Sequence, residues 1–283
     1  MDMNKKDWRN EMLIAFDIDG TIVNDDKQVG DITLKTLYKL KDLGHILVPC
    51  TGRNYKDIPD ILYDKNLISY IIATNGTLVY DTNQDKIINS EYFTPSRFIE
   101  IIDEIKDYHP SIDYASDCMS YTSYDILNNL EAHHLPVVSC KFIRQNRTGV
   151  EDIKEDIIKN KRNINRANIL FKDLDDRLHL LNDQDKFDFT ISTSTNFNAE
   201  IVPKGISKLS GLKYLQNLLK LNDDEIMFFG DNQNDYEALN SNFQTILMLN
   251  GLDSLKMIAK DITKYDNNHD GVGRYLIKYF NID

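Results

Sequence analysis

The feature that most constrains the fold of this chain is a series of short apolar runs, each followed by a polar loop. The first run covers residues 12–16, and two more cover 46–50 and 70–73. Runs of this length that end at polar turns indicate buried strands. Residues 31–43 place isoleucine and leucine at helical spacing, and Gly44 suits the end of that helix. Alternating strand and helix predict parallel β-α-β units.

The same pattern returns in the last third of the chain. The sequence predicts strands at 225–229 and 245–249 and helices at 207–220, at 232–240, from about residue 252 and from residue 272. Residues 82–196 differ, because they mix helical and alternating stretches. We therefore expect an α/β fold with a doubly wound, Rossmann-like parallel-sheet core. The core would comprise residues 1–81 plus 197–283, and residues 82–196 would form an inserted α+β cap domain.

Composition excludes several classes of protein. The chain has 283 residues, of which 41% are hydrophobic and 28% charged, a soluble globular profile that suits one large or two modest domains. No run approaches the roughly 20 apolar residues of a membrane span. Residues 1–10 lack the apolar core of a signal peptide, so we expect a cytoplasmic protein without membrane contact.

Charge and cysteine content narrow the possible ligands. The net charge of −12 argues against general nucleic-acid binding, which needs a basic face. The three cysteines are widely spaced, and neither Cys-x-x-Cys nor His-x-x-x-His occurs, so neither a disulfide framework nor a zinc site is expected. An acidic protein that binds phosphates needs a local positive field from a cation, a few basic side chains or helix N-termini.

Two aspartates follow the first predicted strand directly. Asp17 and Asp19 stand two residues apart in the segment DIDGT at 17–21, so in extended backbone they project to the same side. Such a pair can share a divalent cation, or divide the work as nucleophile and as general acid and base. Asp-Gly between apolar runs is also an ordinary hairpin signal, so this segment alone leaves both interpretations open.

The loops after the second and third predicted strands carry groups that can bind phosphate. Thr51, Gly52 and Arg53 follow the strand that ends at residue 50, and Asn75 follows the strand at 70–73. A hydroxyl, free backbone N–H groups and a guanidinium can hold phosphate oxygens. Each loop alone equally suits a plain turn with a solvated side chain, so neither decides the function.

The loop after the strand at 225–229 is rich in oxygen ligands. Asp231, Asn234 and Asp235 belong to the segment GDNQND at 230–235, and their side chains suit a hard cation such as Mg²⁺. Helix capping is the alternative, but one Asp or Asn is enough for a cap. Lys208 opens a predicted helix against the preference of the helix dipole, which pairing with these carboxylates would explain. A lone lysine is usually solvated, and Lys204 is a competing candidate.

Taken together, these loops follow predicted core strands or open a core helix, and ligands of open α/β sheets bind beyond the carboxyl ends of the strands. The set resembles the haloacid dehalogenase superfamily, and more narrowly its Cof-type, class IIB branch of sugar-phosphate phosphatases. The motifs that carry the resemblance are DIDGT at 17–21, TGR at 51–53, NG at 75–76, Lys208, GDNQND at 230–235 and GV at 271–272. They span nearly the whole chain in the order of the family.

The resemblance implies a role for each motif. Asp17 would be the nucleophile that takes the phosphoryl group, and Asp19 would protonate the leaving oxygen and then activate water. Thr51 would hydrogen-bond the phosphoryl oxygens, with Gly52, Arg53 and Asn75 in the same phosphate-binding loops. Lys208 would hold Asp17 and the phosphate.

The same resemblance implies a magnesium site. Asp231 would bind Mg²⁺ together with Asp17 and the backbone carbonyl of Asp19, and Asp235 would complete the metal site. Asn234 would belong to the phosphate-binding residues. One position departs from the family, which usually has Lys-Gly where this chain has Lys208-Leu209. Lys208 is preferred over Lys204 because its separation from Asp231 matches the spacing of the family.

These expectations make the chain a Mg²⁺-dependent phosphatase that hydrolyses a small phosphorylated metabolite through an aspartyl-phosphate intermediate, with a sugar phosphate as the favoured substrate. A sugar phosphomutase and a non-catalytic sensor of a phosphometabolite are the alternatives. Substrate discrimination is expected from the cap, with residues 116–124 as the candidate substrate-facing segment. The alternative for that segment is a strand and turn whose tyrosines pack in the cap's own core.

Overall fold

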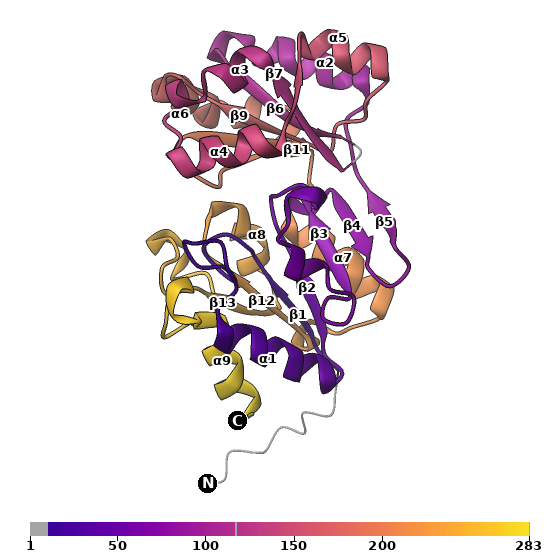
Figure 1. Ribbon diagram of the computed structural model, residues 1–283, viewed down its shortest axis with the longest axis vertical. Coiled ribbons are helices and arrows are strands. Elements are labelled where there is room, and N and C mark those ends of the chain that lie inside the picture. The colour runs from indigo at the N-terminus through magenta and orange to yellow at the C-terminus, as the bar shows by residue number, and fades with distance from the viewer. Residues whose placement is uncertain (1–10, 117, 283) are drawn as a thin grey trace.

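A computed structural model describes residues 11–116 and 118–282. Two bodies lie one above the other, the core below and the cap above (Figure 1). The core sheet has the order β14-β13-β12-β1-β2 and its neighbouring strands are all parallel. Its strands are β1 Leu13–Phe16, β2 Ile46–Pro49, β12 Ile226–Gly230, β13 Gln244–Leu247 and β14 Asp261–Ile262. This arrangement confirms the predicted parallel α/β core.

Helices cover both faces of the core sheet, which explains why its strands are continuous apolar runs. Ile14 and Phe16 of β1 pack in one cluster with residues of α1, Asp31–Asp42, and of α9, Gly271–Phe280. Leu13 and Ala15 pack on the other face with residues of α7, Lys208–Leu219, and of α8, Tyr236–Leu239. The helix expected from residue 252 is only a short 3₁₀ turn, Asp253–Leu255.

An antiparallel extension lies beside β2. It comprises β3 Tyr70–Ala73, β4 Leu78–Asp81 and β5 Lys86–Ser90, and a parallel bridge from Cys50 to Ile72 joins it to the core sheet. The 3₁₀ turn η3, Thr74–Gly76, connects β3 to β4 and packs against the start of α7. This contact brings the loop after β3 to the helix that carries Lys208.

The cap is a six-stranded sheet with helices, in the order β10-β11-β9-β6-β7-β8. Its strands are β6 Ser111–Ser116, β7 Met119–Ser123, β8 Thr148–Val150, β9 Arg166–Leu170, β10 Phe189–Ser192 and β11 Asn198–Pro203. Its helices are α2 Pro95–Glu104, α3 Tyr124–Asn128, α4 Val137–Asn146, α5 Ile153–Asn160 and α6 Leu174–Asn182. In Figure 1, α4 and β11 lie on the side of the cap that faces the core.

Strand pairing bears on the domain boundaries expected at residues 82 and 196. β5 lies inside the expected cap but pairs with β4 beside the core, and β11 lies beyond residue 196 but pairs with β9 and β10. The half-exposed β5 has the mixed composition of the cap, whereas β11 is as buried as a core strand. We propose that the inserted domain begins near residue 91 and ends near residue 203.

Gly76 gives a test of how η3 positions α7. Its φ is +94°, and an added Cβ would lie 2.0 Å from the Ser207 carbonyl oxygen. Gly44 is a matched control, because its φ is +95° and nothing lies within 4 Å of an added Cβ. We expect Gly76→Ala to lose about 1–3 kcal/mol more free energy of unfolding than Gly44→Ala, as overpacking adds to backbone strain. Equal losses in urea denaturation would contradict this contact.

Candidate active site

The polar loops after β1, β3 and β12 meet at the carboxyl ends of the core strands. Asp17 follows β1 directly, and its N–H donates to the Phe229 carbonyl at 2.9 Å, which continues the pairing of β1 with β12. Its side chain is therefore held at the tip of the sheet by backbone that is already ordered. The buried Asp17 carboxylate also forms part of the cavity wall between core and cap.

Lys208 lies at the centre of this loop cluster. Its Nζ is 2.7 Å from Asp17 Oδ1 and 2.7 Å from Asp235 Oδ1, and the side chain is fully buried. Lys204 is instead exposed, with Nζ 3.3 Å from the Phe187 carbonyl oxygen. The helix begins at Lys208 without the glycine usual in the family, because Ser207 and Ser210 form a capping box.

The loop after β12 contains both a helix cap and a carboxylate that faces the site, the two interpretations that its sequence left open. Asp235 Oδ2 accepts the N–H groups of Asp231 and Asn232 at 2.9 and 3.1 Å, which is the capping role. Asp231 is left to face the site, and Thr21 Oγ1 donates to its Oδ1 at 2.8 Å. Gly20 allows this approach, since a Cβ there would lie 2.5 Å from Asp231 Oδ2.

Three buried carboxylates gather at this point. Asp17, Asp231 and Asp235 each offer an oxygen, and these oxygens all lie within 4.8 Å of one another. Burial raises the pKa of Asp17 to about 7, with Lys208 opposing and Asp235 adding to the rise, and burial also raises the pKa of Asp231. A divalent cation, which prefers oxygen ligands, would relieve this repulsion, so the cluster is consistent with a metal site.

The Asp19 carboxylate lies apart from this cluster and is paired with cations. Arg53 donates to it from Nε at 2.6 Å and from Nη2 at 2.8 Å, and Lys27 Nζ donates at 2.8 Å. Burial alone would raise the pKa of Asp19, but these two partners lower it well below its ordinary value. In this arrangement both carboxylate oxygens of Asp19 are engaged.

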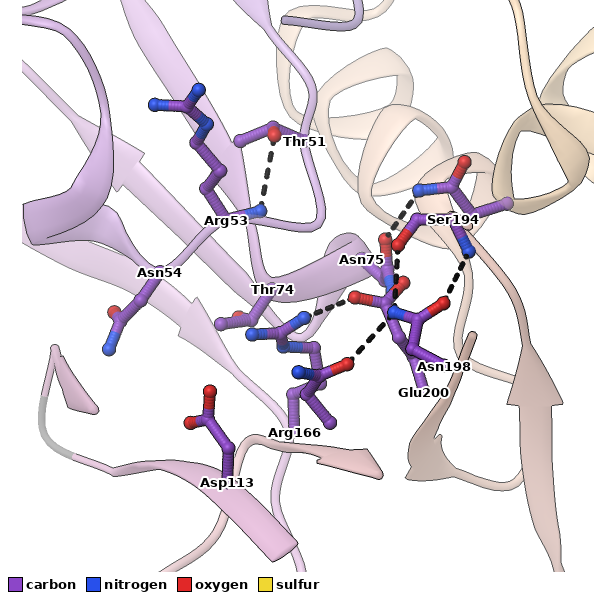
Figure 2. Close-up of polar contacts among 12 residues, drawn as sticks. Thr51, Arg53, Asn54, Thr74, Asn75, Asp113, Arg166, Ser194, Asn198 and Glu200 are labelled. Atoms are coloured by element: carbon purple, nitrogen blue, oxygen red, sulfur yellow. Dashed lines mark hydrogen bonds and ion pairs between the residues drawn. The ribbon is translucent and has the colours of Figure 1, made fainter. Parts of the chain in front are cut away.

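The remaining predicted residues form a second polar group beside the first. Thr51 Oγ1 accepts the N–H of Arg53 at 3.1 Å, and a Cβ at Gly52 would lie 2.9 Å from Asn75 Oδ1. Asn234 Nδ2 donates to Asn75 Oδ1 at 3.3 Å. Figure 2 shows the contact of Thr51 with the Arg53 backbone, and Asn75 beside Asn198 and Glu200, with the Arg53 side chain extending away from them.

A cavity of about 290 Å³ separates these loops from the cap, and sequence reasoning missed its cap residues. Arg166, Asn168 and Glu200 line it, and all three are buried. Arg166 and Asn168 alternate on β9, and Glu200 is the register partner of Asn168 on β11. Polar residues at alternate positions of otherwise apolar strands were the available signal, because such residues share one face of a sheet.

Of residues 116–124, predicted to face the substrate, the described ones, 116 and 118–124, do not line this cavity. Tyr121 is buried and stacks on Tyr114 at 5.3 Å between ring centroids, and Met119 packs against the same cap cluster. Ser120 accepts from Asn54 Nδ2 at 3.1 Å, and Asp117 lies outside the described residues. The alternative interpretation, in which the tyrosines pack in the cap's own core, therefore describes Tyr121 but not Tyr124, which is 48% exposed.

Comparison with known proteins identifies close likenesses over most of the chain. A family model described as haloacid dehalogenase-like hydrolase matches residues 14–276. The 5-amino-6-(5-phospho-D-ribitylamino)uracil phosphatase YitU of Bacillus subtilis is 27% identical over 272 residues, which are 95% of this chain and 98% of that protein.

Two solved structures share the fold. A haloacid dehalogenase-like hydrolase from B. subtilis superposes with a TM-score of 0.81 at 20% identity, over 94% of this chain and 98% of that one. The HAD subclass IIB sugar phosphatase BT4131 superposes with a TM-score of 0.77 at 19% identity, over 96% of this chain and 100% of that one. In the described part of the chain, no helix is long and apolar enough to span a membrane.

The Lys208 pairing generates a stability prediction. Lys208→Met would leave Asp17 and Asp235 buried without their cation, and breaking such a pair costs about 3–5 kcal/mol. We expect this loss in the urea unfolding of the metal-free protein at pH 8, and a smaller loss at pH 5, where Asp17, whose pKa is raised to about 7, takes up a proton. Lys204→Met, on the exposed lysine, should change little. Equal stability of Lys208→Met and the parent protein at pH 8 would contradict the pairing.

Proposed function

We propose that this chain, which belongs to the haloacid dehalogenase-like hydrolase family and is a phosphatase of small phosphorylated metabolites, hydrolyses a sugar phosphate. The proposed reaction depends on Mg²⁺ and passes through an aspartyl-phosphate on Asp17. The observation that carries the proposal is the placement of Asp17. Its carboxylate is buried at the tip of β1, is paired with Lys208 through one oxygen, and borders the cavity.

The donor set fits a magnesium ion, because three buried carboxylates converge within 4.8 Å. Asp17, Asp231 and Asp235 would hold the ion, and the Asp19 backbone carbonyl is proposed as a further ligand. When bound, Mg²⁺ supplies positive charge to the phosphoryl oxygens. Together with Lys208, it provides the local positive field that an acidic protein needs to bind phosphate.

The residues then divide the reaction. The ionised Asp17 attacks phosphorus, the bond from phosphorus to the leaving oxygen breaks, and an acyl phosphate forms on Asp17. Lys208 and the Thr51 hydroxyl stabilise the charge on the transferring group. Water then attacks the same phosphorus, which releases inorganic phosphate and regenerates the Asp17 carboxylate.

Asp19 is the proposed acid and base of both steps, and its surroundings constrain that role. A proton must reside on Asp19 when the leaving oxygen departs, yet Arg53 and Lys27 stabilise the ionised carboxylate. The ion pairs of Asp19 with Arg53 and Lys27 therefore have to change before Asp19 can donate a proton. Substrate binding between Arg53 and the Asp17 loop is the proposed cause of that change.

Phosphate release from hexose phosphates with Mg²⁺ tests the function. We expect stoichiometric release of phosphate and alcohol, and Asp17→Asn should abolish it because the amide cannot serve as the nucleophile. Isomerisation of the sugar phosphate without phosphate release would favour a mutase. Binding of sugar phosphates without any turnover would favour a sensor.

The raised pKa of Asp17 generates a pH prediction for the metal. Protons compete with the cation below about pH 7, because Asp17 must lose its proton to become a ligand, whereas above that pH no proton has to be displaced. We expect the Mg²⁺ concentration for half-maximal activity to be roughly tenfold higher at pH 6 than at pH 8. EDTA should abolish activity at both values. A half-saturating concentration that is the same at pH 6 and pH 8, or full turnover in EDTA, would contradict the site.

A further inference from the structure

The two cap arginines that line the cavity are already neutralised. Arg147 Nη1 lies 2.7 Å from Asp57 Oδ2 and its Nε lies 2.8 Å from Asp113 Oδ2. Arg166 Nη1 pairs with Glu200 Oε1. All of these side chains are at most 6% exposed, so solvent does not supply alternative partners. Neither arginine has charge left to offer a ligand.

The cations on the core side of the cavity lie beside the proposed nucleophile. Lys27 and Arg53 share the single carboxylate of Asp19, so the positive charge that Asp19 does not balance lies next to the position of the transferring phosphoryl group. With the cap arginines, these residues are all the lysines and arginines that line the cavity in the described part of the chain. A second phosphate or carboxylate, on the cap side of the ligand, would therefore meet only arginines that are already paired with carboxylates, which is costly.

The rest of the cavity wall is neutral. The region around α4 contributes apolar side chains, including Leu135, Val138 and Phe142, and the cap sheet contributes the amides of Asn168 and Asn198. Asn198 Nδ2 donates to Asn168 Oδ1 at 2.8 Å, which fixes how these amides are turned. Such a wall suits a ligand that has both an apolar face and an edge of hydrogen-bonding groups.

Two buried polar atoms of the cavity residues have no hydrogen-bond partner. They are Arg166 Nε and Asn234 Oδ1. Both residues belong to one chain of contacts that crosses between the domains, because Glu200 Oε2 accepts from Asn75 Nδ2 at 2.9 Å and Asn75 in turn accepts from Asn234 (Figure 2). Both atoms are almost fully buried, so a ligand hydroxyl, which both donates and accepts, satisfies either of them only after a small turn of the side chain toward the cavity.

We infer that the alcohol released by this phosphatase is neutral, polyhydroxylated and has an apolar ring face, and that Glu200 sets this specificity by neutralising Arg166. The inference rests on the proposed function and adds the chemical class of the leaving group. Phosphate esters whose alcohol carries a second anionic group are excluded. The guanidinium groups of Arg53 and Arg147 lie 5.3 and 6.0 Å from the centroid of the Phe142 ring, and the part of Phe142 that borders the cavity provides the surface for the ring face.

Matched phosphate esters test whether a second anionic group on the alcohol weakens binding. Sorbitol 6-phosphate and 6-phosphogluconate are both linear, and the second adds only a carboxylate at the far end. Each is measured as a competitor of p-nitrophenyl phosphate hydrolysis with Mg²⁺, so an inhibition constant is obtained whether or not the ester is turned over. We expect the neutral ester to bind at least about tenfold more tightly.

Glu200→Gln should bring the inhibition constants of 6-phosphogluconate and sorbitol 6-phosphate closer together, because it releases Arg166 from its ion pair. Glu131→Gln is the matched control. Glu131 also pairs with an arginine, Arg144, at 2.7 Å, but on the cap surface. A ratio of two inhibition constants is insensitive to the amount of folded enzyme, so a general defect of Glu200→Gln does not affect it. An unchanged ratio in Glu200→Gln, or a parent enzyme that binds 6-phosphogluconate as tightly as sorbitol 6-phosphate, would overturn the inference.

The ring face is tested with glucose 6-phosphate against sorbitol 6-phosphate. Phe142→Ala should weaken binding of the cyclic ester more than that of the linear one, whereas Val137→Ala, which alters an exposed neighbour on α4, should leave both unchanged. If Phe142→Ala weakens the binding of both esters equally, the inferred apolar ring face of the alcohol is wrong. If p-nitrophenyl phosphate itself is not hydrolysed in an Asp17-dependent way, the proposed function fails instead.

Discussion

The buried ion pair of Lys208 with Asp17 and Asp235 is the interaction on which the rest of the site depends. One Lys208 Nζ lies 2.7 Å from each carboxylate, in a place where burial disfavours all three charges. These residues come from the loop after β1, from α7 and from the loop after β12, so their contact fixes the relative positions of three separate segments. The same contact orients the proposed nucleophile, so packing of the core and chemistry of the site have a common cause.

Much of the core could be predicted because its signals are local. Apolar runs identify β1, β3 and β12, and each functional loop follows directly from the strand before it. Lys208 and its aspartates were predicted for the same reason, since strands in a parallel sheet place their carboxyl ends together. Spacing from Asp231 favoured Lys208 over Lys204, and the structure buries Lys208 beside Asp17 while Lys204 is exposed.

The cap side of the site could not be predicted in the same way. The pairing of β11 with β9 places Glu200, Arg166 and Asn168 together at the cavity, and the sequence alone does not reveal this pairing. Residues 116–124 have the composition of a binding segment, yet Tyr121 serves the cap's own core by stacking on Tyr114. Composition indicates what a segment can contact, whereas strand register decides which of its faces meets the cavity. The ion pairs of Asp19 are likewise invisible to sequence reasoning, because Arg53 lies in another loop.

The most direct test of the central claim is to locate the phosphoryl group during turnover. The enzyme is mixed with a hexose phosphate or p-nitrophenyl phosphate and Mg²⁺, quenched in acid within the first turnover, digested, and its peptides are analysed by mass spectrometry. The account predicts one phosphoryl group on the peptide that contains Asp17, and its absence when Asp17→Asn is treated identically. Phosphate release at the normal rate with no phosphoryl group on that peptide, or with the group on another residue, would contradict Asp17 as the nucleophile.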